Sequence, residues 1–157
     1  MTAEEYQKEA QRLTPQLRQT AFRYMKDATL SEDIAQDVLL KLWQLLDELR
    51  VPMDGLAQTM VRNECLMRLR RQQHTVDIEG NDRAEEPEDH HLADLMLVVL
   101  DQLPPLQRTI LRLRHIDGMA IADIAALLHR EETSIRQNIS RGRKTLRQLM
   151  IEKMKEE

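Results

Sequence analysis

One segment of this sequence, residues 76–91, contains almost nothing that a folded core could bury. It reads VDIEGNDRAEEPEDHH and combines seven acidic residues with Gly, Asn and Pro, which is typical of a solvated connection between domains. We therefore predict an acidic flexible linker over residues 75–91, between a first domain over residues 1–74 and a second over residues 92–157. Domains of this size are close to the smallest that fold alone.

Both flanks of this segment favour α-helices. The chain is 41% hydrophobic but only 3% aromatic, and its 157 residues include four Gly and five Pro. A core of Leu, Ile, Val, Met and Ala with few β-branched runs is atypical of β-sandwiches and barrels, and so few glycines argue against a Gly-rich phosphate loop. The predicted fold class is all-α, with two small helical domains, the second containing a helix-turn-helix.

The first flank has the pattern of two amphipathic helices. One is predicted over residues 31–49 with Ser31 as its N-cap, and another over residues 56–71, after a break at residues 51–55. Apolar side chains recur with the spacing of a buried helical face: Ile34, Ala35, Val38, Leu39, Leu42, Leu45, Leu46 and Leu49 in the first, and Ala57, Met60, Val61, Cys65 and Leu69 in the second. Another face of the first helix is polar, and we expect it to stay solvated or to meet a partner.

The second flank has the pattern of a helix-turn-helix. Helices are predicted over residues 92–103 and 106–116, the latter closed by Asp117-Gly118, and a short helix over residues 120–128 precedes a polar turn and a longer helix. One stripe of the longer helix is apolar except for a glycine: Ile135, Ile139, Gly142, Leu146 and Leu149. A helix-turn-helix inserts the N-terminal end of its second helix into the major groove. A solvated amphipathic helix is the alternative explanation.

Charge is distributed unevenly along the chain. The net charge is −4, but residues 73–101 carry −8 and residues 102–157 carry +4. Residues 133–149 contain no acid and five cations: Arg136, Arg141, Arg143, Lys144 and Arg147. This density can neutralise several phosphates. Arg136 and Gln137 suit base edges, whereas Ser140, Arg141, Arg143 and Lys144 lie further along the helix, toward phosphates.

Signals of an enzyme or a membrane protein are weak. The one cysteine, Cys65, lies on an apolar stripe and excludes a disulfide framework, and Trp43 is expected to be core or half-buried. A metal site on the adjacent His90 and His91 is a remote alternative, because their spacing does not converge on one ion. We expect no signal peptide, because the stretch MTAEEYQKEAQRL has no apolar core, and no stretch approaches about 18 uninterrupted apolar residues. We predict a cytoplasmic protein that is not an enzyme, with no cofactor, metal, small-molecule substrate or direct membrane insertion.

Three motifs in this order resemble the extracytoplasmic-function (ECF) class of bacterial RNA polymerase sigma factors, within the sigma-70 family. LSEDIAQDVLLKLW (residues 30–43) is similar to the family's second region, and VRNECLMRLRR (residues 61–71) to the part of it that melts and reads the minus-10 element. The stretch of residues 102–149, from QLPPLQR to RKTLRQL, is similar to the fourth region, which reads the minus-35 element. The resemblance covers nearly the whole chain.

The resemblance implies partners and site residues. It implies a factor that binds core RNA polymerase, directs promoter-specific initiation on promoter DNA and is a possible target of an anti-sigma factor. The polymerase contacts would be Asp33, Gln36, Asp37 and Lys41. The minus-10 contacts would be Arg50, Asp54, Arg62, Asn63, Arg70 and Arg71, and the minus-35 contacts Ser134, Arg136, Gln137, Ser140, Arg141, Arg143 and Lys144.

The chain departs from the family pattern at several positions. Leu56 and Gln58 stand where relatives commonly have aromatic residues, and Met67 stands where an aspartate is usual. In the helix-turn-helix, His129 and Arg130 replace a usual Gly and an apolar residue. These positions bear on base stacking and on the geometry of the turn.

Two other functions stay open from the sequence. A stand-alone helix-turn-helix regulator would bind duplex DNA tightly without polymerase and would dimerise, although no coiled-coil heptads appear. A helical protein-interaction adaptor would keep its activity when the charges of Arg136 and Arg141 are reversed, whereas a sigma factor would lose recognition of one promoter element.

Overall fold

The computed structural model describes residues 1–80 and 87–156, with side chains at 1–73 and 94–156. All regular secondary structure in these ranges is helical, which confirms the all-α prediction. The chain divides into two compact units, unit 1 (Met1–Asn81) and unit 2 (Asp82–Glu157).

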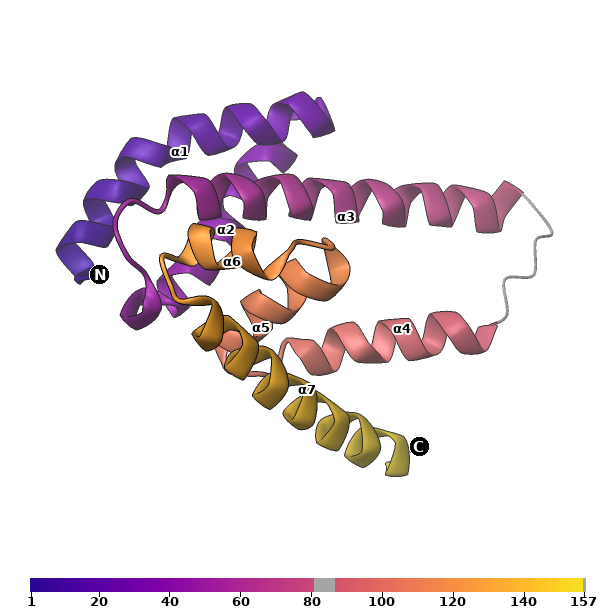
Figure 1. Cartoon of the computed structure of the whole chain (residues 1–157). Helices are drawn as coiled ribbons and strands as arrows, with labels where there is room; N and C mark the ends of the chain where they lie inside the picture. Colours follow the sequence, from indigo (N-terminus) through magenta and orange to yellow (C-terminus); the bar gives the residue numbers. More distant parts are fainter. Residues whose placement is uncertain (81–86, 157) are drawn as a thin grey trace. The chain divides into compact units, whose positions relative to one another are not determined.

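Within residues 1–80, unit 1 is built from α1 (Ala3–Met25), α2 (Ala28–Gln44) and α3 (Asp54–Gly80), with a 3₁₀ turn, η1 (Leu46–Glu48), after α2. Each of the three α-helices packs against the other two (Figure 1). Their facing sides form the core, whose members include Leu13, Leu17, Ala21, Ile34, Val38, Leu42, Ala57, Val61 and Cys65. The apolar stripes predicted for α2 and α3 are therefore largely confirmed, although Leu46, Met60 and Leu69 are only half-buried.

Helix α1 was not among the predicted helices. Its start is fixed by a capping box, in which the Thr2 hydroxyl accepts from the Glu5 N–H at 3.1 Å and the Glu5 carboxylate accepts from the Thr2 N–H at 3.4 Å. The Thr-x-x-Glu spacing is the signal that identifies this helix start. Leu13, Leu17 and Ala21 then supply the third side of the core of unit 1.

The predicted start of α2 is wrong by one helical turn. The helix begins at Ala28, and its N-cap is Asp27, whose carboxylate accepts from the Leu30 N–H at 2.9 Å. Ser31 lies inside the helix and is buried, and its hydroxyl donates a hydrogen bond to the Asp27 carbonyl oxygen at 2.6 Å. Both residue types cap helices well, and Asp27 takes the role because Lys26, at φ 59°, ends α1 immediately before it.

The predicted linker is shorter than its composition suggests. Helix α3 does not end at Arg71 but continues to Gly80, and α4 (Pro87–Leu100) begins inside the acidic segment. No Gly or Pro interrupts residues 72–79, and Pro87 followed by two acids suits the first turn of a helix. Of the predicted linker, residues 81–86 lie outside the described residues.

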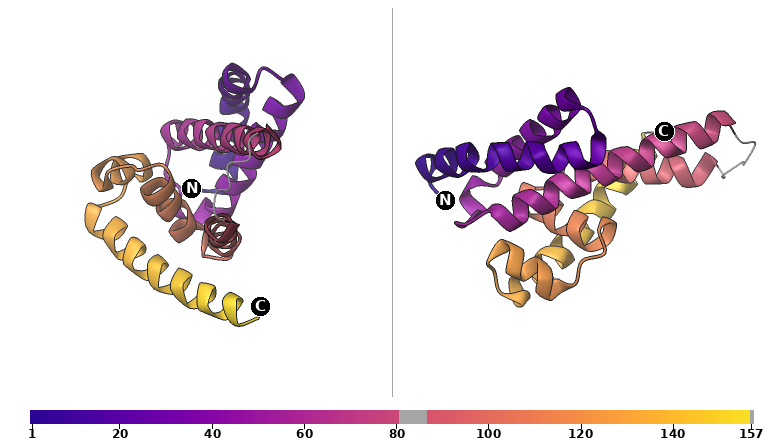
Figure 2. Two further views of the ribbon diagram at one scale, coloured as in Figure 1. Left: turned by 90° about the vertical axis from the view of Figure 1, so that its right-hand side faces the viewer. Right: turned by 90° about the horizontal axis from the view of Figure 1, so that it is seen from above.

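Within residues 87–156, unit 2 contains α4, α5 (Pro105–Leu111), a five-residue π-helical segment η2 (Arg112–Ile116), α6 (Ile121–Leu128) and α7 (Glu132–Lys155). Helices α4, α5 and α6 each pack on α7, whose C-terminal part continues past α5 (Figure 2). The predicted closure at Asp117-Gly118 is confirmed, because Gly118 has φ 69°. The buried side chains include Val99, Leu100, Leu103, Ile110, Leu111, Ile124, Leu128, Ile135 and Ile139.

Helices α5 and α7 approach closely at Gly142, which is buried. A Cβ atom added there would lie 2.9 Å from Cδ1 and 3.2 Å from Cγ of Leu111, a side chain that is itself buried. The glycine therefore lets the two helices make contact at a distance that a larger residue would prevent.

Candidate nucleic-acid interface

Helix α7 has an apolar side and a polar, basic side. Ile135, Ile139 and Gly142 are buried. The residues predicted to contact DNA lie on the other side and are exposed, except for the half-buried Ser134: Arg136, Gln137, Ser140, Arg141, Arg143 and Lys144. Because α7 packs through one side only, the whole basic side stays accessible to a polyanion.

The turn between α6 and α7 forms without glycine. His129 adopts the left-handed conformation, at φ 54° and ψ 45°. Its N–H donates to the Ala126 carbonyl oxygen at 3.3 Å, and the Arg130 N–H donates to the Ala125 carbonyl oxygen at 2.9 Å. This is the hydrogen-bond pattern of a Schellman motif, so replacement of the usual Gly leaves the turn intact.

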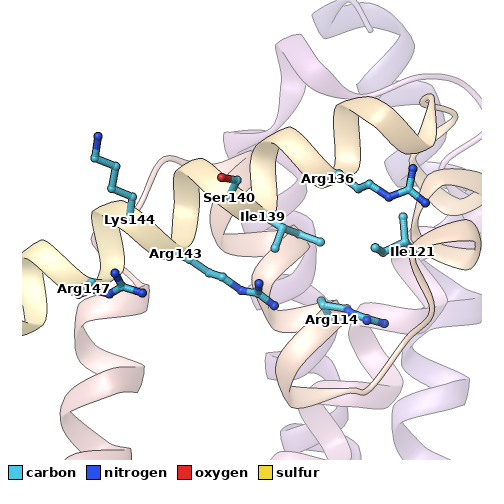
Figure 3. Close-up of a pocket in the computed structure, with 8 residues that line it drawn as sticks. All are labelled: Arg114, Ile121, Arg136, Ile139, Ser140, Arg143, Lys144 and Arg147. Atoms are coloured by element: carbon cyan, nitrogen blue, oxygen red, sulfur yellow. The ribbon is translucent and has the colours of Figure 1, made fainter.

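A groove of about 620 Å³ lies between α7, η2 and the start of α6 (Figure 3). Arg136, Ile139 and Arg143 extend from α7 toward Ile121 and Arg114 (Figure 3). The lining contains five cationic side chains: Arg114, Arg136, Arg143, Lys144 and Arg147. A concentration of positive charge in a concave surface attracts phosphate strongly.

Two of these cations, Arg114 and Arg147, were not among the predicted DNA contacts. Arg147 is signalled by its position, four residues after Arg143 on the same side of α7. Arg114 comes from η2 and reaches the groove only through the tertiary fold, where its Nη1 donates to the Met119 carbonyl oxygen at 2.9 Å. Sequence spacing alone has no signal for it.

Arg143 is oriented by a histidine. Its Nε donates to Nε2 of His115 at 3.0 Å. Burial, followed by the positive charges of Arg143 and Arg114, lowers the pKa of His115 below its usual value, which favours the neutral imidazole that can accept this hydrogen bond. At the start of α7, Arg136 forms an ion pair with Glu132 at 3.3 Å.

A second candidate surface lies on α2. Asp33, Gln36 and Asp37 are exposed on one face, and the same face carries two large apolar side chains, Leu40 at 59% and Trp43 at 45% exposure. The prediction that Trp43 is core or half-buried is wrong, because its side chain is exposed on this face, where its ring meets that of Tyr6 edge-on at 5.1 Å. Sequence reasoning missed Leu40, although its spacing of three and four from Asp37 and Gln36 places it on this face.

Charged side chains connect this surface to α3. The Arg68 guanidinium lies 2.9 Å from a carboxylate oxygen of Asp37 and 3.1 Å from one of Glu64. Lys41 also pairs with α3, since its Nζ lies 3.7 Å from a carboxylate oxygen of Glu64. Of the four predicted polymerase contacts, Asp33 and Gln36 therefore share the open face, whereas Asp37 and Lys41 lie at its border with α3.

The predicted minus-10 contacts lie along α3 and the loop before it. Arg62, Asn63 and Arg70 share the side of α3 that faces away from the core, whereas Arg71 lies on the flank, with a guanidinium nitrogen 3.6 Å from the Met67 sulfur. At 1.5 Å per residue, the span from residue 54 to residue 70 is about 24 Å. The structure thus places these residues in an elongated track.

Leu56 and Gln58 are not available as stacking platforms. Leu56 is buried in the core, and the side-chain oxygen Oε1 of Gln58 accepts from the Thr20 hydroxyl at 2.7 Å. At the head of α3, Arg50 is exposed, but Asp54 forms an ion pair with Arg12 of α1 at 2.6 Å.

Sites for other chemistry have little support. Cys65 is buried, and desolvation raises the pKa of its thiol to about 11, so it packs as an apolar residue. Among the side chains that the structure describes, no group of three or more His, Cys, Asp or Glu could hold a metal ion. The side chains of His90 and His91 lie outside that set. In the described part of the chain, no helix is long and apolar enough to cross a membrane.

Comparisons with known proteins match both units. The model of sigma-70 region 2 matches residues 10–75, and the model of sigma-70 region 4 matches residues 93–146. The probable RNA polymerase sigma factor RfaY of Xanthomonas campestris pv. campestris is 28% identical over 148 residues, which cover 85% of this chain and 37% of that protein. The chain thus spans little more than a third of the length of this relative.

A solved structure also aligns with this chain. The co-crystal structure of the sigma factor RpoE in complex with the anti-sigma factor NepR, from Bartonella quintana, aligns with a TM-score of 0.45 at 23% identity, over 94% of this chain and 98% of that chain. The two region models are the stronger finding, because one falls on each compact unit, in the order region 2 and then region 4. The chain therefore belongs to the sigma-70 family of RNA polymerase sigma factors.

Proposed function

We propose that this chain binds core RNA polymerase and directs promoter-specific transcription initiation by recognising minus-10 and minus-35 elements. The observation that carries the proposal is that each sigma-70 region coincides with a compact unit that has an exposed candidate surface. A stand-alone regulator gives no account of the region 2 match, and a helical adaptor gives none of the basic side of α7.

The first domain, residues 1–74, binds polymerase through the open face of α2. Asp33 and Gln36 supply polar contacts, with Asp37 and Lys41 at the border. Leu40 and Trp43 supply the apolar centre, and an exposed tryptophan surrounded by polar groups is a common anchor of protein interfaces.

The same domain reads and opens the minus-10 element along α3. Arg62, Asn63, Arg70 and Arg71 follow the backbone of the unpaired strand, and Arg50 of the preceding loop meets an unpaired base. Guanidinium planes stack on bases as aromatic rings do. Because Leu56 is buried, stacking on an unpaired base is left to arginine in this chain.

The second domain, residues 92–157, reads the minus-35 element with the N-terminal part of α7 in the major groove. Arg136 and Gln137 meet base edges, while Ser134, Ser140, Arg141, Arg143 and Lys144 lie toward phosphates. Arg114 and Arg147 extend the phosphate contacts on the groove side. The acidic connection over residues 75–91 repels DNA, so the two domains act as separate weak readers that gain affinity when polymerase holds both near the promoter.

In vitro transcription with purified core polymerase tests the proposal on a library of genomic fragments. The discriminating variant is Asp33→Arg/Gln36→Arg, because both residues are exposed on α2 and neither is part of the Asp37–Arg68 ion pair. We expect promoter-specific transcripts that require the wild-type chain and disappear with this variant, together with loss of a stable complex with core.

Glu4→Arg/Gln7→Arg is the matched control. It changes an acid and a glutamine three residues apart on the exposed side of α1, with the same change in net charge, and should leave transcription intact. If the wild-type chain instead forms no complex with core and binds duplex DNA tightly alone, it is a stand-alone regulator and the proposal fails.

Three further features complete the proposal. Sigma factors are non-enzymatic initiation factors, so we expect no catalytic activity of this chain itself. Its place of action is the cytoplasm, where core polymerase transcribes. An anti-sigma factor that covers the polymerase and DNA surfaces is a third partner, and pull-down from the native cell would contradict this if polymerase alone were recovered.

A further inference from the structure

Three charged side chains join α1 to the start of α3. Arg12 forms a bidentate ion pair with Asp54, in which Nη1 lies 2.8 Å from Oδ2 and Nη2 lies 2.6 Å from Oδ1. The same Nη2 lies 2.7 Å from Oε2 of Glu9, and that oxygen accepts from the backbone N–H of Met53 at 3.4 Å. We name Glu9, Arg12 and Asp54 the α1–α3 clamp.

The clamp lies at the end of the loop that carries Arg50. Leu49 and Met53 are buried, whereas Arg50, Val51 and Pro52 between them are exposed. An apolar side chain thus anchors each end of the loop, and the clamp fixes the second end through the Met53 N–H and through Asp54. Three exposed residues between two fixed ends have little freedom to rearrange.

Asp54 is occupied within the clamp. Both of its carboxylate oxygens accept from Arg12, and this pairing lowers the pKa of Asp54 below its usual value. A carboxylate whose two oxygens are paired, and whose charge has the sign of a phosphate, is poorly suited to contact DNA. As the first residue of α3 it instead suits the positive end of the helix dipole.

We propose that Arg12 is a positioning residue for minus-10 recognition, which acts by holding the loop of residues 50–53 through Asp54 and Glu9. This inference rests on the proposed function, and it reassigns Asp54 from a DNA contact to a support. Taking a base out of the duplex costs free energy, and ordering a loose loop at the same step would add to that cost. The clamp acts by geometry more than by stability, because the side chains of Arg12 and Asp54 are 45% and 41% exposed.

The test uses a promoter recovered with the wild-type chain, with its minus-10 region already opened by mismatches. The quantity measured is the ratio of transcription from the cognate minus-10 bases to transcription from substituted bases. We expect Arg12→Gln to lower this ratio about ten-fold, which corresponds to about 1.4 kcal/mol, while affinity for core polymerase stays unchanged. Arg12→Lys keeps the charge but not the two parallel hydrogen bonds, and should lower the ratio by less.

Arg18→Gln is the matched control. Arg18 lies on the same helix, is 44% exposed and pairs with Glu32 of α2 at 3.7 Å, so its loss should leave the ratio unchanged. Asp54→Asn should lower the ratio as far as Arg12→Gln does. The double variant should lower it no further, because all three break the same pair.

Several outcomes overturn the inference. An unchanged ratio in Arg12→Gln, even with a lower thermal midpoint, shows that the clamp is only structural. A double variant whose loss is the product of the two single losses shows that Asp54 contacts DNA directly. If the wild-type chain gives no transcript with core polymerase, the proposed function fails and the positioning role fails with it.

Discussion

His129 holds the left-handed conformation at the turn between α6 and α7, and it does so with a Cβ atom. This conformation costs a non-glycine residue about 1–2 kcal/mol. Glycine avoids this cost, but it loses more conformational entropy on folding, which offsets part of the gain. We expect His129→Gly to stabilise unit 2 by up to about 1 kcal/mol, measured by denaturant unfolding. His129→Ala keeps the Cβ and is the control, and equal stability of the two variants would contradict the strain.

His115 makes the stability of unit 2 depend on pH. Its pKa is lowered in the folded chain by burial, then by Arg143 and Arg114, so the unfolded chain binds more protons around the ordinary histidine pKa of about 6.5. Stability therefore falls as pH falls through that value toward the folded pKa. The thermal midpoint of unit 2 should drop on acidification, and His115→Gln should remove this component. An unchanged pH slope in the variant would rule out His115 as its source.

Single residues also show where sequence reasoning succeeds. The exposed residues of α7 follow from helical periodicity, because Ile135, Ile139 and Gly142 define the buried side and leave the cations opposite. Arg12 and Arg114 could not be found this way, since each acts on a segment that only the tertiary fold brings near. Helical spacing predicts neighbours within one element and has no information on pairs between elements.

At the scale of elements, Gly142 controls the approach of α7 to α5. Even a Cβ atom at this position would lie 2.9 Å from Cδ1 of Leu111, a buried side chain, so a larger side chain forces Leu111 or the two helices to move. We expect Gly142→Leu to destabilise unit 2 by about 1–3 kcal/mol and to weaken minus-35 recognition. Thermal unfolding and transcription from a promoter dependent on its minus-35 element measure the two effects.

Gly118→Leu is the control for Gly142→Leu. A Cβ atom at Gly118 meets no atom within 4 Å, so any loss there reflects backbone strain at its φ of 69°. Equal stability of wild type and Gly142→Leu would show that α5 and α7 separate without cost, contrary to their observed close approach.

Composition predicts the ends of individual helices poorly. Residues 75–80 and 87–91 contain acids and little apolar surface, yet they are helical, because α3 continues from a packed helix and α4 begins at a favourable Pro-Glu-Asp turn. Conversely, α1 was overlooked although its Thr2–Glu5 capping box is readable. Polar composition reports that a segment lacks a core of its own, not that it lacks a helix.

At the scale of the whole molecule, the two units have separate cores. We expect two unfolding transitions by calorimetry. Leu111→Ala should lower only the transition of unit 2, and Leu42→Ala only that of unit 1, each by about 2–5 kcal/mol of stability. A single transition that both variants shift equally would show that the units unfold as one.

The division into two units was foreseeable because it rests on summed composition. An acidic, core-poor segment separates two stretches that can each bury a face, and the family match follows the same division. Such a signal is averaged over many residues, so it survives errors of several residues at the ends of individual helices.

The aromatic residues give the two units very different optical properties. Tyr6, Phe22, Tyr24 and Trp43 all lie in unit 1, and unit 2 has none. Since Trp43 is the only tryptophan and is 45% exposed on α2, its emission should shift to shorter wavelength when core polymerase covers that face. Binding of DNA by unit 2 would be silent in the same signal. The fluorescence of Trp43 can therefore follow the binding of core polymerase over time without an added label.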